Sequence, residues 1–128
     1  MERQSKNEKL LQYFKDICRI PRQTGDEEAI SQYLLDFAKA RGLQAERDAH
    51  HNVLIRKPST IPGYKGPTVI VQGHMDIVYE KSADSTHKYE DGIHVVEEDG
   101  YLKSADGTSL GADNGLAVAY AMDLLDRN

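Results

Sequence analysis

A short apolar run that leads into a glycine and a histidine is the feature that most constrains the fold. Residues 68–71 read Thr-Val-Ile-Val, and Gly73 and His74 follow after one glutamine. An unbroken run of this kind is typical of a strand that is buried on both faces, as in an α/β sheet. We therefore expect His74 to lie just past the carboxyl end of a buried strand, where ligand sites of open α/β sheets form.

Two amphipathic helices are predicted before this strand. Each begins with the pattern of a capping box, at residues 5–8 (Ser5 to Glu8) and at residues 24–27 (Thr24 to Glu27). Pro21 ends the first helix because it cannot donate a backbone hydrogen bond. The second helix is predicted to end at Arg41-Gly42, with a cation in its last turn and a glycine behind it.

The rest of the chain adds strands and a third helix. Four further strands are predicted, at residues 43–48, 52–56, 93–96 and 101–103. The Asp99-Gly100 dipeptide predicts a hairpin between the last two. From Asn114 the pattern is helical again, and its small residues predict close packing against a sheet. We expect an α/β fold in which helices flank a partial mixed sheet. A helix after such a strand normally leads to another strand, so residues 1–128 are expected to be part of a larger domain.

Composition excludes several classes of partner. The net charge is −5, from 16 basic and 21 acidic residues, which argues against binding nucleic acid. The beginning of the chain is polar, and no window is apolar enough to span a membrane, so we expect a soluble cytoplasmic protein without a membrane partner. The single cysteine, Cys18, lies in a helical pattern and is predicted to be a packed core thiol rather than a nucleophile.

Three side chains are candidates for chemistry. His74 and Asp76 are two residues apart, so in an extended chain they point the same way. The Asp76 carboxylate can then hold one ring nitrogen of His74 while the other binds a metal. Asp113 stands among small residues at the start of a predicted helix, where a metal or substrate can approach. A plain helix N-cap remains the alternative for Asp113, and a surface role remains the alternative for His74.

Other polar residues are assigned no chemistry. The remaining histidines, expected on the surface, are His50, His51, His87 and His94. The acidic pairs at residues 27–28 and 97–98 fit a helix start and a hairpin turn. Ser109 lacks the glycine-flanked setting of a nucleophile elbow.

Taken together, the motifs resemble a known peptidase family. The strongest matches are residues 72–78 (Gln-Gly-His-Met-Asp-Ile-Val) and residues 105–115 (Ala-Asp-Gly-Thr-Ser-Leu-Gly-Ala-Asp-Asn-Gly), supported by residues 20–22 and 52–58. They resemble the M20 family of co-catalytic metallopeptidases, in particular its aminoacyl-histidine dipeptidase branch. The resemblance covers nearly the whole chain, and residues 105–115 are specific to this branch. It implies that residues 1–128 are the N-terminal portion of the family's catalytic domain.

The resemblance implies a role for each candidate residue. His74 matches a metal-binding histidine, Asp76 the active-site aspartate that supports it, and Asp113 the aspartate that bridges two divalent metals, usually zinc. The peptide bond after Asp113 is commonly cis in the family. The family is expected to hydrolyse Xaa-His and other unblocked dipeptides as a homodimer. Its general base and remaining ligands lie further along the sequence, so this chain alone is expected to bind metal weakly and to be inactive.

Two alternatives stay open. One is an amino-acid deacylase of the same superfamily, against which residues 110–115 argue. The other is a non-catalytic interaction module, because open strand edges favour pairing between copies of a chain.

Overall fold

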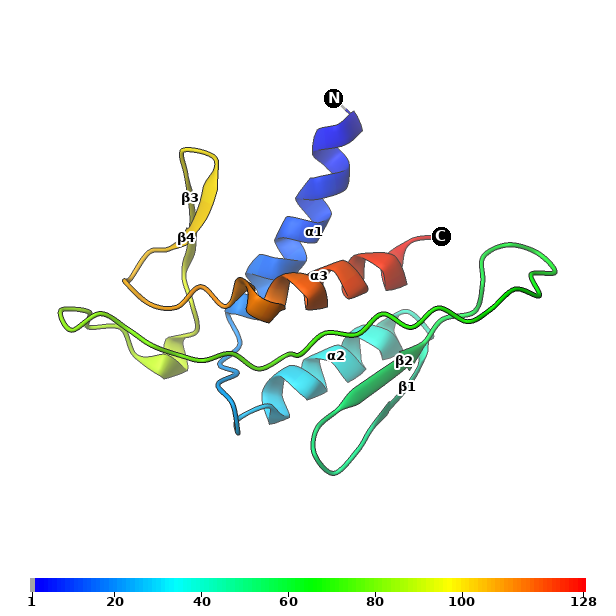
Figure 1. Cartoon of the computed structure of the whole chain (residues 1–128), viewed down its shortest axis with the longest axis horizontal. Coiled ribbons are helices and arrows are strands. Elements are labelled where there is room, and N and C mark those ends of the chain that lie inside the picture. Colours follow the sequence, from blue (N-terminus) through cyan, green and yellow to red (C-terminus); the bar gives the residue numbers. More distant parts are fainter. Residues whose placement is uncertain (1) are drawn as a thin grey trace.

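Residues 2–128 form three α-helices, one short 3-10 helix and two small sheets (Figure 1). The structure is a computed structural model that describes the backbone of residues 2–128 and the side chains from residue 7 onward. The elements, in chain order, are α1 (Glu2–Cys18), α2 (Glu28–Ala40), β1 (Gln44–Arg47), β2 (Val53–Arg56), the short 3-10 helix η1 (Tyr89–Asp91), β3 (Val95–Glu98), β4 (Tyr101–Ser104) and α3 (Ala112–Asp126). The predicted α/β class is confirmed.

The strands form two separate antiparallel pairs rather than one mixed sheet. β1 pairs with β2, and β3 pairs with β4. The predicted hairpin between β3 and β4 is confirmed, and its turn residues Asp99 and Gly100 both have positive φ, at 53° and 79°. Parallel pairing in the described residues is limited to an isolated bridge between Gln23 and Ile77. The expectation of one mixed sheet is therefore wrong.

The buried strand expected at residues 68–71 is also wrong. These residues are extended but belong to no strand, and Figure 1 shows them as a bare trace that runs past α2 and α3. Val69 is 79% exposed and Ile70 is 85% exposed. The physical reason is that none of the described strands runs beside this segment, so its backbone has no ladder partner and its side chains have no covering layer.

The core lies between the three helices, and α3 contacts α1 rather than a sheet. The buried side chains that the helical patterns predict, drawn from α1, α2 and α3 in turn, are Leu10, Phe14, Ile17, Cys18, Ile30, Leu34, Phe37, Ala38, Val118, Ala119 and Met122. The small residues of α3 admit close neighbours, since a Cβ at Gly115 would lie 3.2 Å from Phe14 Cε2. None of the described helices is both long and apolar enough to cross a membrane.

Both predicted capping boxes are wrong. Helix α1 begins at Glu2, so Ser5 lies inside it, and the Ser5 side chain is outside the described residues. Helix α2 begins three residues later than predicted, with Glu27 rather than Thr24 as its N-cap. The Thr24 hydroxyl instead donates a hydrogen bond to Asp76, 2.7 Å away. The C-terminal end of α2 is as predicted, because Gly42 has φ 66° and its N–H bonds the carbonyl of Lys39 at 3.0 Å.

Candidate functional site

Residues 73–77 are held in place from two sides. On one side, Ile77 N–H donates to the Arg22 carbonyl at 3.0 Å, and Thr24 N–H donates to the Ile77 carbonyl at 3.1 Å. On the other side, Gly73 lies against α3 so closely that a Cβ there would be 2.9 Å from the Ala117 Cβ. The extended segment therefore places His74 opposite the N-terminal end of α3.

The three predicted site residues come together around the His74 ring. Its Nδ1 lies 3.0 Å from the Asp76 carbonyl oxygen and 3.1 Å from the Asp76 carboxylate oxygen Oδ1. Its Nε2 lies 3.1 Å from Asp113 Oδ1. Partial desolvation lowers the pKa of His74, but the contacts with Asp76 and Asp113 outweigh it, so the pKa is raised overall. One ring nitrogen is thus anchored to Asp76, while the other faces Asp113.

Asp76 is itself oriented by a second hydrogen bond. The Thr24 hydroxyl contacts Oδ2 of the carboxylate, while Oδ1 faces the imidazole. The Thr24 hydrogen bond is the main cause that lowers the pKa of Asp76, and His74 adds to it. Both oxygens of an ionised carboxylate are therefore engaged, which fixes the direction in which it holds the His74 ring.

Asp113 lies just inside the start of α3 but does not cap it. Gly111, with φ 78°, is the N-cap residue, so the alternative of a plain N-cap at Asp113 is wrong. Asp113 and Asn114 depart from helical backbone angles, and the bond between them is cis, as the family resemblance implies. The Asp113 side chain is 96% exposed, with His74 as its partner. Its carboxylate is available to a ligand that approaches from solvent.

The donor set fits part of a zinc site. Two ligand atoms at ordinary zinc distances in tetrahedral geometry are about 3.3 Å apart, which is close to the His74 Nε2 to Asp113 Oδ1 separation. An imidazole nitrogen and a carboxylate oxygen are both common zinc ligands. Among residues 7–128, however, no group of three or more histidine, cysteine, aspartate or glutamate side chains could hold a metal. His74 and Asp113 could supply two ligands, whereas zinc sites in proteins use three or four.

The other histidines are not part of this cluster. The surface position predicted for His87 is wrong. His87 is buried rather than on the surface, because its ring contacts the Tyr79 hydroxyl at 2.7 Å and the Gly92 carbonyl at 2.5 Å. His94 is exposed and contacts Asp106 at 2.7 Å. His50 is exposed, and His51 is half-buried.

Sequence reasoning missed two residues that touch the site, Arg22 and Thr24. Both follow Pro21, shortly after the end of α1 at Cys18, and both contact the segment around Asp76. The available signal was that residues 20–22 belong to the motifs shared with the peptidase family. Nothing in their spacing or type marks them out, because their partners lie more than 50 residues away.

Two known proteins are similar to most of this chain. The cytosol non-specific dipeptidase of Escherichia coli (strain K12) is 38% identical over 116 residues, which are 91% of the chain. The crystal structure of aminoacylhistidine dipeptidase from Vibrio alginolyticus matches 92% of the chain, with a TM-score of 0.86 and 35% identity. In both cases the chain spans 24% of the relative, about a quarter of its length. No family model matches the chain.

Proposed function

We propose that this chain supplies part of a two-metal dipeptidase site, because it is homologous to a segment of the cytosol non-specific and aminoacylhistidine dipeptidases. The homology agrees with the branch that its motifs indicate. The observation that carries the proposal is the meeting of His74 Nε2 with Asp113 Oδ1, while Asp76 anchors the opposite ring nitrogen.

Each residue has a distinct task in this proposal. The Asp76 carboxylate accepts a hydrogen bond from the Nδ1–H of His74, so that the Nε2 lone pair would face a metal. Asp113, at the exposed start of α3, would hold the two divalent metals, which are expected to be zinc. When bound, such metals lower the pKa of a water molecule and polarise the scissile carbonyl. Thr24 keeps the Asp76 carboxylate turned toward the imidazole.

The substrates follow from what the relatives are named for. We propose that the whole protein hydrolyses unblocked dipeptides, Xaa-His among them, in the cytoplasm as a homodimer. A deacylase is less favoured because both relatives are dipeptidases. We further propose that residues 1–128 are the N-terminal portion of the catalytic domain. Since they offer two metal ligands, we expect no dipeptide hydrolysis by this chain alone.

Zinc titration of the 128-residue chain, followed by NMR, tests the site. We expect weak binding that is lost in His74→Ala and in Asp113→Asn. His94→Ala is the matched control, because His94 also pairs with an aspartate but lies outside the site. Equal zinc binding by the wild type and by His74→Ala would refute the proposed ligands. Zinc-dependent hydrolysis of Ala-His by the chain alone would refute its inactivity.

A chimera tests the dipeptidase activity itself. In it, this chain replaces the matching segment of the Escherichia coli relative, which then supplies the remainder of the protein. We expect the chimera to hydrolyse Ala-His and the His74→Ala chimera to be inactive. A folded, zinc-loaded chimera without activity would argue against the proposed function.

A second candidate function is self-association of this chain through residues 68–71. Val69, Ile70 and Val71 are exposed on an extended segment with no strand partner among the described residues. An unpaired apolar segment is a template for pairing with a second copy. Analytical ultracentrifugation is expected to show a concentration-dependent dimer that Ile70→Lys abolishes. A monomer at all concentrations would refute this candidate.

A further inference from the structure

Arg22 is the largest fully buried side chain of the described residues, and it is 1% exposed. Among residues 7–128, no carboxylate lies within ion-pair distance of it. Its Nε is buried without a hydrogen-bond partner. Burial of a guanidinium without a counter-ion is unfavourable, so the groups that do accept its hydrogen bonds must explain its position.

Those acceptors are backbone carbonyls of the two segments that carry the site residues. The first segment is residues 73–77, and the second is residues 111–115 at the start of α3. Arg22 Nη1 donates to the carbonyl of Met75 at 2.9 Å, and Nη2 donates to the carbonyl of Gly111 at 3.1 Å. Met75 lies between His74 and Asp76, and Gly111 lies two residues before Asp113. The two donors belong to one rigid, planar group. Arg22 therefore sets the distance between the two segments.

The glycines of the second segment make room for this guanidinium. A Cβ at Gly111 would lie 2.9 Å from Arg22 Nη2, and a Cβ at Gly115 would lie 2.7 Å from the same atom. At either position a methyl group would force the guanidinium to shift. The sequence alone suggests that these small residues admit a metal or a substrate, but the space beside them is filled by Arg22.

The backbone of Arg22 makes a further hydrogen bond to the first segment. Its carbonyl accepts a hydrogen bond from Ile77 N–H at 3.0 Å, beside the bridge between Gln23 and Ile77. The residue is thus fixed at both its backbone and its side chain. A displaced guanidinium would shift Gly111 relative to Met75, and with them the atoms of Asp113 and His74.

We propose that Arg22 is a positioning residue that holds His74 Nε2 and Asp113 Oδ1 at the separation needed to share a metal. This inference rests on the proposed function for the metal and on the hydrogen bonds above for the geometry. Arg22 is buried behind the two site segments, so it acts through their backbones rather than on a substrate.

Three variants of the 128-residue chain test this role. Arg22→Met keeps the bulk of the side chain but removes both donors, and Arg22→Lys retains one cationic donor. Arg41→Met is the matched control, because Arg41 also bonds a backbone carbonyl, that of Phe37, but lies at the opposite end of α3. The readouts are the ring ¹⁵N signals of His74 without zinc, assigned with His74→Gln, and the zinc affinity by NMR titration.

We expect Arg22→Met to shift the His74 ring signals and to weaken zinc binding about tenfold, as is typical when a group supporting a ligand is lost. Arg22→Lys should recover part of both effects. Arg41→Met should lower stability without changing either readout in the folded chain. Unchanged ring signals and affinity in folded Arg22→Met would overturn the proposal.

If Arg22→Met does not fold, Gly115→Ala tests the same role. This variant retains the arginine, but its added methyl group pushes the guanidinium out of its position. Its ring signals should move as described, and unchanged signals would overturn the role of Arg22. If the wild type binds no zinc, the proposed function fails, yet the zinc-free ring signals still decide whether Arg22 positions His74.

Discussion

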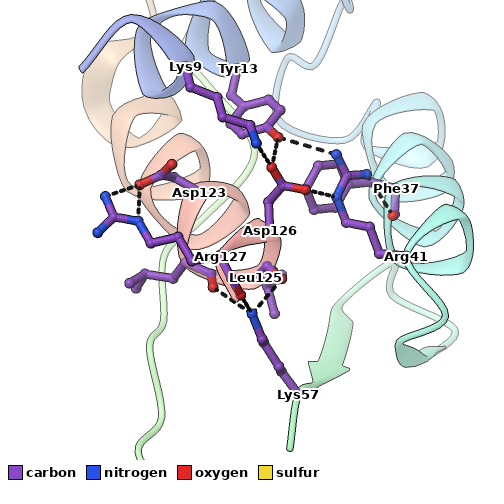
Figure 2. A network of polar contacts seen from close by, with 10 residues as sticks. Lys9, Tyr13, Phe37, Arg41, Lys57, Asp123, Leu125, Asp126 and Arg127 are labelled. Carbon is purple, nitrogen blue, oxygen red and sulfur yellow. Dashed lines mark hydrogen bonds and ion pairs between the residues drawn. The ribbon is translucent and has the colours of Figure 1, made fainter. Parts of the chain in front are cut away.

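The two ends of α3 each carry an aspartate, and the two carboxylates have opposite surroundings. At the C-terminal end, Asp126 is 15% exposed and contacts Lys9, Arg41 Nε at 2.6 Å and the Tyr13 hydroxyl at 2.8 Å (Figure 2). At the N-terminal end, Asp113 is 96% exposed, and its partner in the described part of the chain is one imidazole.

The difference is also electrostatic. A helix C-terminus disfavours a negative charge, so Asp126 needs the cations around it. Figure 2 shows Lys57 at the same end, where its ammonium group donates to the carbonyls of Leu125, at 3.0 Å, and of Arg127. These last carbonyls have no partner within the helix. Asp113 stands at the end where a negative charge is favoured and needs no such network.

The comparison separates a carboxylate that stabilises the fold from one that can bind a ligand. The donors around Asp126 come from α1 and from Arg41, the C-cap residue of α2, so this network joins the three helices. A metal arriving at Asp126 would have to displace two cations. At Asp113 it would meet an exposed carboxylate beside a ring nitrogen.

Asp126→Asn should have the largest effect on stability. It removes the charge that accepts hydrogen bonds from Arg41 and Tyr13, and it leaves the Arg41 guanidinium half-buried without its counter-ion. We expect the free energy of unfolding in urea to fall by about 2 kcal/mol. Zinc binding by the folded protein should not change. A loss no greater than that of a surface substitution would contradict the contrast between the two ends.

Lys57→Met should have an intermediate effect. It removes the cation that bonds the last carbonyls of α3, and we expect a loss of about 1 kcal/mol in urea unfolding. Lys65→Met, in the exposed loop before residues 68–71, is the control and should change stability little. Equal losses in the two variants would mean that the C-terminal carbonyls of α3 do not depend on Lys57.

Asp113→Asn should change the free energy of unfolding by less than about 0.5 kcal/mol, because its side chain is exposed and has one partner. The same variant should lose zinc binding. Urea unfolding and zinc titration on one sample measure both. A large loss of stability would show that Asp113 is part of the framework, and the contrast with Asp126 would then fail.

Cys18→Ala should have the smallest effect. It tests whether the interior beside the N-terminal end of α3 excludes water as the rest of the core does. Burial raises the pKa of the Cys18 thiol, although Arg22 beside it acts in the opposite direction. The unfolded chain therefore releases the thiol proton at lower pH than the folded chain. Stability should fall as pH rises above the ordinary thiol pKa, more in the wild type than in Cys18→Ala. Parallel pH profiles of urea unfolding would contradict this.

Local chemistry was predictable from the sequence, and long-range partners were not. The end of α2 at Gly42 and the hairpin turn at Asp99-Gly100 depend on backbone conformations that these residues favour by themselves. The strand expected at residues 68–71 depends on neighbouring strands that the described residues do not provide. An apolar run indicates what could be buried, not whether a layer is there to cover it.

The site shows the same division. His74 and Asp76 are two residues apart, so their contact follows from the local geometry of an extended chain. Asp113 is 39 residues from His74, and its place there was expected through the family resemblance rather than through spacing. The local pattern predicts Thr24 as a helix cap, but its hydroxyl donates a hydrogen bond to Asp76, which lies 52 residues away in the sequence.

The guanidinium beside Gly111 and Gly115 has a consequence for how such sequences can diverge. Positions 22, 111 and 115 occupy one shared volume, so a change at one alters what the others tolerate. A methyl group at position 115 must displace the guanidinium while arginine fills the space, and this conflict is relieved once a shorter side chain stands at position 22. Relatives should therefore exchange these positions in tandem, and an alanine at position 115 should accompany the loss of the arginine.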